Sequence, residues 1–195
     1  MLPFISFRPI VCGVAALTFL SMRSVPASHA LTIEKVTFAD STAIGGKSVP
    51  LRNAGLLRYM KMIRVYVSAL YLPEDVKAED VLSDVPKRLE LSYMIAIKGT
   101  EFGKGAAPTL ERNQTPAELA RLKPRIDRIN SAYRDVKPGD RYSLTYLPGR
   151  GTELALNNIP LLTIEGADFA AAYFGIWLGR NPFDEGLKRD LLKGR

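Results

Sequence analysis

The segment LLRYMKMIRVYVSALYLPE, residues 56–74, constrains the fold more than any other part of the chain. Its β-branched and aromatic residues alternate with other side chains from Leu57 to Leu72, and Pro73 follows directly. A period of two is typical of a β-strand, and a proline interrupts the hydrogen-bond ladder of a sheet. We therefore predict one long strand over residues 57–72.

Alternation divides this expected strand into two faces. One face would be apolar and would carry Ile63, Val65, Val67, Ala69 and Tyr71. The other would be mixed and would carry Arg58, Met60, Met62, Arg64, Tyr66, Ser68 and Leu70. Lys61 would point away from Arg58 and Arg64, toward solvent. Cations beside apolar side chains suggest a site for an anion that also has an apolar part.

Further segments follow in an order typical of α+β domains. Strands are expected over Thr32–Phe38, Arg88–Ile97, Arg141–Leu147, Thr152–Leu156 and Pro160–Ile164, with Asn157-Asn158 as a tight turn. Helices are expected over Glu101–Asn113, from Thr115 to about Tyr133 with a kink or interruption at Pro124, over Ala167–Leu178, and after Asp184. The fold class that follows is α+β, with a mostly antiparallel sheet covered by helices on one face.

The N-terminal residues have the layout of a secretory signal peptide. Arg8 precedes an apolar run, Ile10–Met22, which is shorter than the roughly 20 residues that span a membrane. Ser28-His29-Ala30 offers small residues at the −3 and −1 positions of a cleavage site, and Ala27 is an alternative cleavage point. We therefore expect a signal peptide over residues 1–30 and a periplasmic or secreted protein.

The mature chain, residues 31–195, would form one domain without a transmembrane segment. Cleavage would remove Cys12 and His29, the only cysteine and the only histidine, which excludes a Ser-His-Asp triad, a thiol nucleophile, a disulfide and a histidine metal site. We expect no metal and no cofactor. Loss of Arg8 and Arg23 lowers the net charge from +7 to +5, and its even spread suits an acidic small ligand better than nucleic acid.

The chain resembles the bacterial secreted branch of the chalcone isomerase-like family from about Leu31 to Leu192. The resemblance is carried, in order, by AGLLRYMKMIRVYVSALYLPE, KPRIDRIN, DRYSLTYLPGRGT, TIEGADFAAAYFGIWLG and NPFDEGLKRDLL. It implies an open-faced β-sandwich whose ligand cleft lies between the sheet and the helices. It also implies three possible activities: cyclisation of chalcones in plant enzymes, fatty-acid binding in plastid relatives, and non-catalytic helper roles.

The resemblance places a functional arginine on the long strand, and Arg58 matches it. The plant pattern has this arginine two residues after a glycine, whereas here it stands three residues after Gly55. Tyr66 stands where the plant isomerases carry a threonine. A guanidinium can grip an oxygen anion with two hydrogen bonds, and a tyrosine adds a neutral donor. We predict that Arg58 and Tyr66 bind the polar end of a ligand, and that they are the catalytic residues if the protein is an enzyme.

Five further residues are candidates for the same site. Arg64 could supply a second cation, Met60 and Met62 could line an apolar tunnel, and Tyr93 and Tyr173 could face the cleft. Each also has an ordinary structural explanation, because arginine is common at surfaces and methionine and tyrosine are common in cores. The sequence leaves both explanations open.

Our preferred hypothesis is non-catalytic binding of a small amphipathic anion, such as a fatty acid. An isomerase of the intramolecular lyase type is the first alternative. There Arg58 would stabilise a phenolic ligand's oxyanion and Tyr66 the developing enolate. The second alternative is an envelope interaction protein without a ligand. A filled cleft and an Arg58 paired with an internal carboxylate would favour it.

Overall fold

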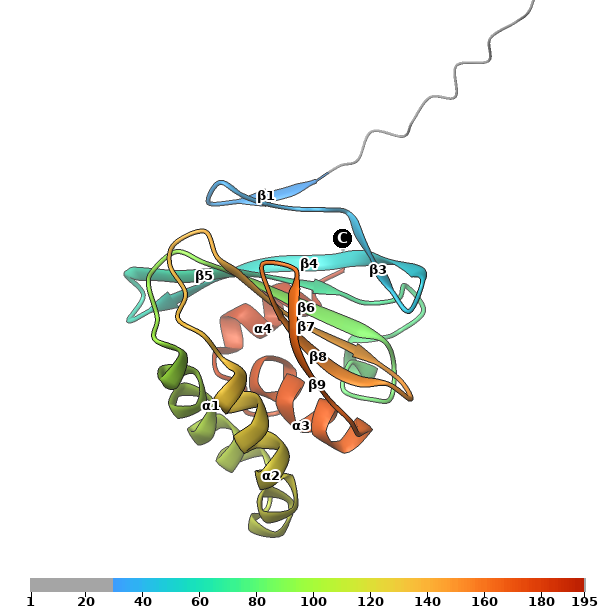
Figure 1. Ribbon diagram of the computed structural model, residues 1–195. Coiled ribbons are helices and arrows are strands. Elements are labelled where there is room, and N and C mark those ends of the chain that lie inside the picture. The colour runs from blue at the N-terminus through green and yellow to red at the C-terminus, as the bar shows by residue number, and fades with distance from the viewer. Residues whose placement is uncertain (1–29, 195) are drawn as a thin grey trace, which may run out of the picture.

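Seven strands form one antiparallel sheet in the computed structural model, which describes residues 30–194 (Figure 1). The strands lie in chain order: β3 (Ser41–Ile44), β4 (Lys47–Tyr59), β5 (Ile63–Tyr71), β6 (Lys87–Tyr93), β7 (Arg141–Leu147), β8 (Gly151–Leu156) and β9 (Ile159–Ile164). The expected signal peptide lies outside the described residues, apart from Ala30. Because neighbours in sequence are neighbours in the sheet, most connections are short, and only β6 and β7 are joined by a long helical segment.

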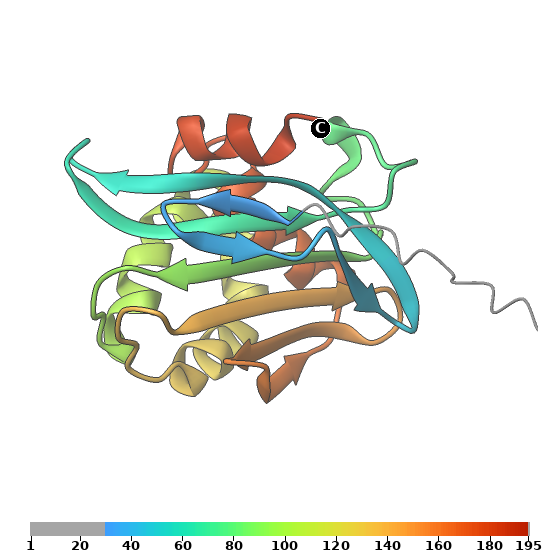
Figure 2. The same cartoon turned by 90° about the horizontal axis from the view of Figure 1, so that it is seen from above.

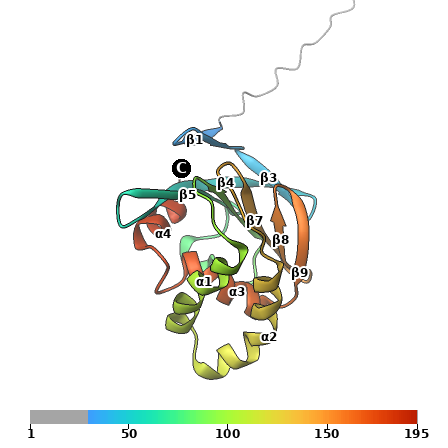
Figure 3. The same cartoon turned by 60° about the vertical axis from the view of Figure 1, so that its left-hand side comes forward.

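Four helices cover one face of the sheet (Figures 1 and 3). They are α1 (Gly99–Asn113), α2 (Pro116–Ala132), α3 (Ala167–Leu178) and α4 (Glu185–Leu192), and a short 3-10 turn spans Ala78–Asp80. The predicted α+β class, with a mostly antiparallel sheet and helices on one face, is confirmed. Within residues 30–194, none of the helices combines the length and apolar character that crossing a membrane requires.

A small hairpin, β1 (Leu31–Ile33) and β2 (Val36–Phe38), lies on the face of the sheet opposite the helices (Figures 1 and 2). The prediction of a single strand over 32–38 was wrong, because the chain reverses at Glu34 and Lys35, which both have positive φ angles. Its apolar residues pack with those of β3, β4 and β5 in a second hydrophobic cluster. The sheet is therefore covered on both sides, by helices on one and by this hairpin on the other.

Residues 57–72 form two strands rather than one. β4 and β5 are antiparallel, and the chain turns between Tyr59 and Ile63. Met60 and Lys61 take left-handed backbone conformations, with φ of 49° and 62°. Such angles favour Gly, Asn or Asp, so neither residue signals a turn in the sequence. The predicted long strand was wrong because the alternation of side chains runs on through the turn without a break.

A β-bulge at Val65 changes which face each side chain occupies. Leu57 pairs with Tyr66, but the next residue, Arg58, pairs with Arg64, so Val65 has no residue opposite. Val65 packs with Leu57 and Tyr66 on the helix side, whereas the arginines lie on the side of the β1–β2 hairpin. The predicted mixed face is therefore wrong, because the bulge inverts the alternation there.

The helix caps predicted at Thr115 and Asp184 are present. Thr115 accepts a hydrogen bond from the backbone N–H of Glu118, whose carboxylate accepts from the backbone N–H of Thr115, which completes the capping box at the start of α2. Asp184 caps α4 through the backbone N–H of Leu187, at 2.7 Å. However, α2 continues through Pro124 to Ala132. A proline removes one helical hydrogen bond, and here the helix continues beyond it.

Lys87 is fully buried at the start of β6. Its ammonium donates to the carbonyl oxygens of Ser83, at 2.8 Å, and Val85, at 2.9 Å, and lies 4.6 Å from the ring centroid of Tyr146. Burial lowers the pKa of Lys87 to about 8, although the charge of Asp84 opposes the shift. The fold therefore holds a lysine whose charged form it disfavours.

We predict that Lys87 makes the protein more stable as pH rises from about 8 to 10. The pKa of Lys87 is about 8 in the folded chain, whereas the ordinary value of 10.5 applies to the unfolded chain. Between these values the unfolded chain binds more protons, so the free energy of unfolding should increase, by roughly 2 kcal/mol. Urea denaturation of wild type and Lys87→Met across this range measures the effect. Parallel pH profiles for the two proteins would contradict it.

Candidate functional site

A cavity of about 580 Å³ lies between the helix side of the sheet and the helices. Strands β4 to β8, helices α1 and α3 and the segment before α4 contribute to its wall. Most of the wall is apolar and includes Leu57, Val65, Leu91, Ile97, Phe102 and Ile176. Ligand sites for small molecules commonly have this size and this apolar character. The cavity is therefore the candidate functional site.

Besides the exposed Tyr59, five tyrosines line the cavity, and each has a polar hydroxyl group: Tyr66, Tyr93, Tyr133, Tyr142 and Tyr173. The rings of Tyr66, Tyr93, Tyr142 and Tyr133 pack edge to face in succession, with centroid distances of 5.6, 6.1 and 5.1 Å, and the ring of Tyr173 stacks on Phe169. This packing holds the rings in place, because each ring edge rests on a neighbouring ring face. The hydroxyl groups are therefore held at defined positions around an apolar space.

The hydroxyl groups differ in how far they are already satisfied. The Tyr66 hydroxyl accepts a hydrogen bond of 3.0 Å from the indole N–H of Trp177, which leaves its own proton free to donate. The Tyr133 and Tyr173 hydroxyls lie 2.9 Å apart, so only one of their two protons is used between them. Tyr142 is satisfied by the backbone of Arg134, through its N–H and its carbonyl oxygen. Spare donors therefore remain for a ligand oxygen.

Burial keeps these phenols neutral. It raises the pKa of Tyr66, Tyr93, Tyr133 and Tyr173 above the ordinary value for tyrosine. The charge of Asp184 adds to this effect at Tyr66. A neutral phenol can donate a hydrogen bond to a carbonyl or carboxylate oxygen, but at neutral pH it is not a base. The wall can thus orient a polar group by donation without removing a proton from it.

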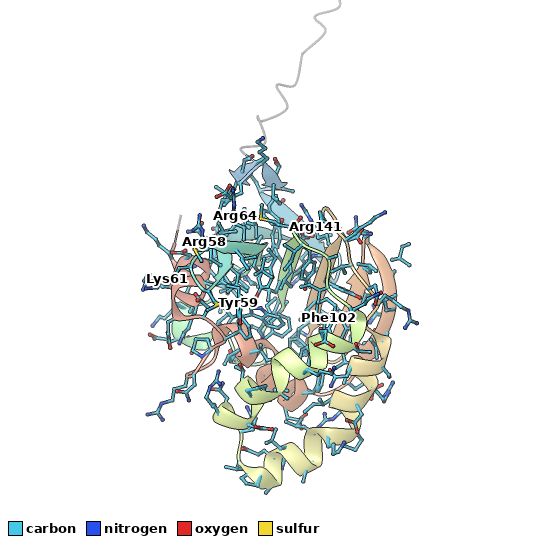
Figure 4. The ribbon with its side chains drawn as sticks, turned by 90° about the vertical axis from the view of Figure 1, so that its left-hand side faces the viewer. Arg58, Tyr59, Lys61, Arg64, Phe102 and Arg141 are labelled. Atoms are coloured by element: carbon cyan, nitrogen blue, oxygen red, sulfur yellow. The ribbon has the colours of Figure 1, made fainter. Side chains whose placement is uncertain are left out.

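Arg58 lines the cavity but its guanidinium is bound elsewhere. Its Nη2 donates to Oε1 of Glu34 at 3.3 Å, while Nη1 of Arg64 donates to Oε2 of the same carboxylate at 2.5 Å. Both arginine side chains are about half exposed, at 48% and 53%. Figure 4 shows Arg58 and Arg64 near the β1–β2 hairpin, with Tyr59 and Phe102 closer to the helices. The cation therefore sits at the rim of the cavity, held by a carboxylate from the other face.

The spacing after Gly55 explains this placement. Gly55 faces α4, because a Cβ on it would lie 2.9 Å from atoms of Leu187 and Asp190. Alternation then puts the second residue after it, Leu57, on the helix side, where it is 4% exposed and lines the cavity. The third residue, Arg58, falls on the opposite side. At the position where the plant pattern has its arginine, the cavity wall of this protein has a leucine.

The predicted site residues are only partly brought together. Arg58, Met60, Tyr66, Tyr93 and Tyr173 line the cavity, whereas Met62 and Arg64 are not among its lining residues. Met60 and Met62 lie in the β4–β5 turn, with 72% and 81% of their surface exposed. Of these two methionines, only Met60 lines the cavity, and it does so at the rim. The ligand-binding roles of all seven residues stay predictions.

Sequence reasoning missed several residues of the cavity wall. Tyr133 and Phe102 stack with 4.6 Å between their ring centroids, and the indole N–H of Trp177 donates to the Tyr66 hydroxyl. The helical spacing of Phe102, Gly105 and Ala106, and of Tyr173 and Trp177, could have indicated one shared face on each helix. Tyr133 had no such signal, since its place depends on how α2 ends.

Two carboxylates complete the rim of the cavity. Glu101 accepts a hydrogen bond of 2.8 Å from Lys104, which lowers its pKa, and Asp184 is engaged as the cap of α4. Neither is joined by other ligating side chains, and residues 30–194 contain no group of three His, Cys, Asp or Glu that could hold a metal ion. The chemistry the cavity offers is thus apolar enclosure with neutral donors.

Comparison with known proteins agrees with this architecture. A family model described as chalcone isomerase-like matches residues 30–193, while no curated protein matches the chain. Among solved structures, the fatty-acid binding protein AtFAP1 of Arabidopsis thaliana is similar, with a TM-score of 0.62 and 16% sequence identity over 84% of this chain and 95% of that one. At this identity the likeness shows a shared fold. By its family match and its fold, the chain belongs to the chalcone isomerase-like family.

Proposed function

We propose that this protein binds a small amphipathic molecule with a long apolar part, such as a fatty acid, without changing it chemically. The observation that carries the proposal is the cavity of about 580 Å³, with its apolar wall and neutral phenol donors. An apolar chain gains about 0.8 kcal/mol for each methylene group that it buries. A similar fold in a fatty-acid binding protein supports the same ligand class.

The carboxylate of such a ligand would lie at the rim, with its apolar chain inside. A carboxylate deep in the cavity would be costly, because the only cationic side chain among the described lining residues is Arg58, at the rim. At the rim, Arg58 could exchange Glu34 for the ligand, and the free proton of the Tyr66 hydroxyl could donate to it. This arrangement uses the same two residues that the sequence indicated.

The alternatives have less support. Cyclisation of a chalcone needs a cation that holds a phenolate beside the enone, and the guanidinium of Arg58 is engaged by Glu34 at the rim of the cavity. A ligand-free interaction protein was expected to have a filled cleft and an Arg58 paired with an internal carboxylate. Arg58 is indeed paired with a carboxylate of the same chain, Glu34, but the cleft is not filled, since a cavity of about 580 Å³ remains. The unfilled cavity favours ligand binding.

We also propose that the protein works outside the cytoplasm. The support is the signal-peptide pattern that ends at Ala30, directly before the first residue of β1, Leu31. The test is the N-terminal residue of protein recovered from the periplasm or medium of the producing cells. A mature chain that begins at Leu31 or Ser28 would support export, and a cytoplasmic protein that retains Met1 or Leu2 would contradict it.

The cavity can be tested by filling it. Ala106 lines it from α1, so Ala106→Trp should occupy ligand space and weaken dodecanoate binding at least tenfold, as measured by isothermal titration calorimetry. Ala120→Trp, at an exposed position of α2, is the matched control and should bind dodecanoate as wild type does. Equal affinity in both variants would show that the ligand binds elsewhere.

The rim can be tested with two arginines that share one partner. Arg58 and Arg64 both bind Glu34 and are similarly exposed, but only Arg58 lines the cavity. Arg58→Ala should weaken dodecanoate binding roughly three- to tenfold, because one charged hydrogen bond at a partly exposed site is lost. Arg64→Ala should have little effect, and dodecanol, which lacks the carboxylate, should bind both variants as it binds wild type. If Arg58→Ala leaves dodecanoate affinity unchanged, the polar end is not at Arg58.

A further inference from the structure

The large hydrophobic side chains that the described residues expose are concentrated at the cavity rim. Six are exposed: Tyr59 (59%), Met60 (72%), Met62 (81%), Ile63 (48%), Phe183 (46%) and Ile159 (66%). We call the first five the apolar tip. Tyr59, Met60, Ile63 and Phe183 line the cavity, and Met62 lies within the same β4–β5 turn. Ile159, the sixth, begins β9, which is at the other edge of the sheet. Such a concentration marks an interaction surface.

The turn's own geometry does not explain these side chains. Met60 has a φ of 49° and Lys61 a φ of 62°, where Asn or Gly would be less strained. Both residues are exposed, and the β4–β5 turn that contains them forms an extremity of the molecule in two perpendicular views (Figures 1 and 2). Exposure of the Met60 and Met62 side chains to water is therefore unfavourable, and no feature of the turn compensates for it. A partner that covers the tip would recover it.

Positive charge flanks the β4–β5 turn of the apolar tip. Lys61 lies between the two methionines and forms no ion pair with any residue in the described chain. Arg58 and Arg64 flank the turn, and the single carboxylate of Glu34 serves both. Three cations and one carboxylate thus stand at the β4–β5 turn (Figure 4), while the rim carboxylates Glu101 and Asp184 are engaged by Lys104 and by the cap of α4. Exposed apolar side chains flanked by cations at this turn match a layer of anionic headgroups above hydrocarbon.

We propose that the apolar tip docks onto an anionic lipid membrane. The tip's apolar side chains would enter the headgroup region while Lys61 and the flanking arginines contact lipid phosphates. The cavity mouth would then face the acyl layer, so that an apolar ligand could pass between membrane and cavity without crossing water. The exchange of ligand rests on the proposed function, whereas the docking itself does not.

Vesicle co-sedimentation tests the docking. Wild-type protein should bind phosphatidylcholine vesicles that contain phosphatidylglycerol more tightly than vesicles of phosphatidylcholine alone, and added salt should weaken the binding. Met62→Asp places a charge in the tip at a residue that does not line the cavity, and should weaken binding roughly tenfold or more. Ile159→Asp, equally disruptive to an exposed apolar contact but remote from the tip, should bind vesicles as wild type does.

A charge reversal tests the lipid headgroup contact. Lys61→Glu should remove the preference for anionic vesicles, whereas Lys47→Glu, at the opposite end of β4, should keep it. Dodecanoate affinity without vesicles should be unchanged in Met62→Asp and Lys61→Glu, which separates failure of docking from failure of the cavity.

Three results would overturn the proposal. They are a wild-type protein that binds neither kind of vesicle, a Met62→Asp variant that binds them as well as wild type, and a wild-type dimer in analytical ultracentrifugation that Met62→Asp dissociates. The last result would make the tip an interface between two copies of the chain.

Discussion

The direction of the side chains on β4 and β5 governs the chemistry of the whole molecule. One face of this hairpin lines the cavity and the other packs against the β1–β2 hairpin, so each residue belongs to one environment or the other. The bulge at Val65 and the three-residue spacing from Gly55 to Arg58 decide the sorting. Leu57 and Tyr66 fall inside, whereas the guanidinium groups of Arg58, at the rim, and Arg64 are bound to Glu34 on the hairpin side. The cavity is neutral for this reason.

Features that depend on a few neighbouring residues could be predicted from the sequence. The capping box at Thr115, the cap at Asp184 and the turn at Asn157-Asn158, where both residues have positive φ, are all present. Each is decided by side chain to backbone hydrogen bonds or by residues that tolerate left-handed angles, so the local sequence contains the information. The helix over Ala167–Leu178 was likewise found with its observed bounds.

Features that depend on tertiary packing could not be predicted from the sequence. A turn made by Met60 and Lys61 has no turn residues, and a bulge at Val65 leaves no mark in the alternation. The same applies to Tyr133, which reaches the cavity only because α2 ends beside α3, where its hydroxyl meets that of Tyr173. Of the predicted site residues, Tyr66, Tyr93 and Tyr173 line the cavity, and Arg58 does so at the rim, with its guanidinium bound to Glu34 from the β1–β2 hairpin.

A neutral cavity with a charged rim has consequences for how a ligand enters. Desolvating a carboxylate is far more costly than desolvating a hydrocarbon chain, so the apolar end of an amphipathic ligand would enter first and the carboxylate would stay at the rim. There it would compete with Glu34 for Arg58. Replacement of Glu34 by glutamine would remove the competitor while keeping the side chain's shape, and should increase dodecanoate affinity relative to wild type. A decrease measured by calorimetry would mean that Glu34 instead holds Arg58 in its binding position.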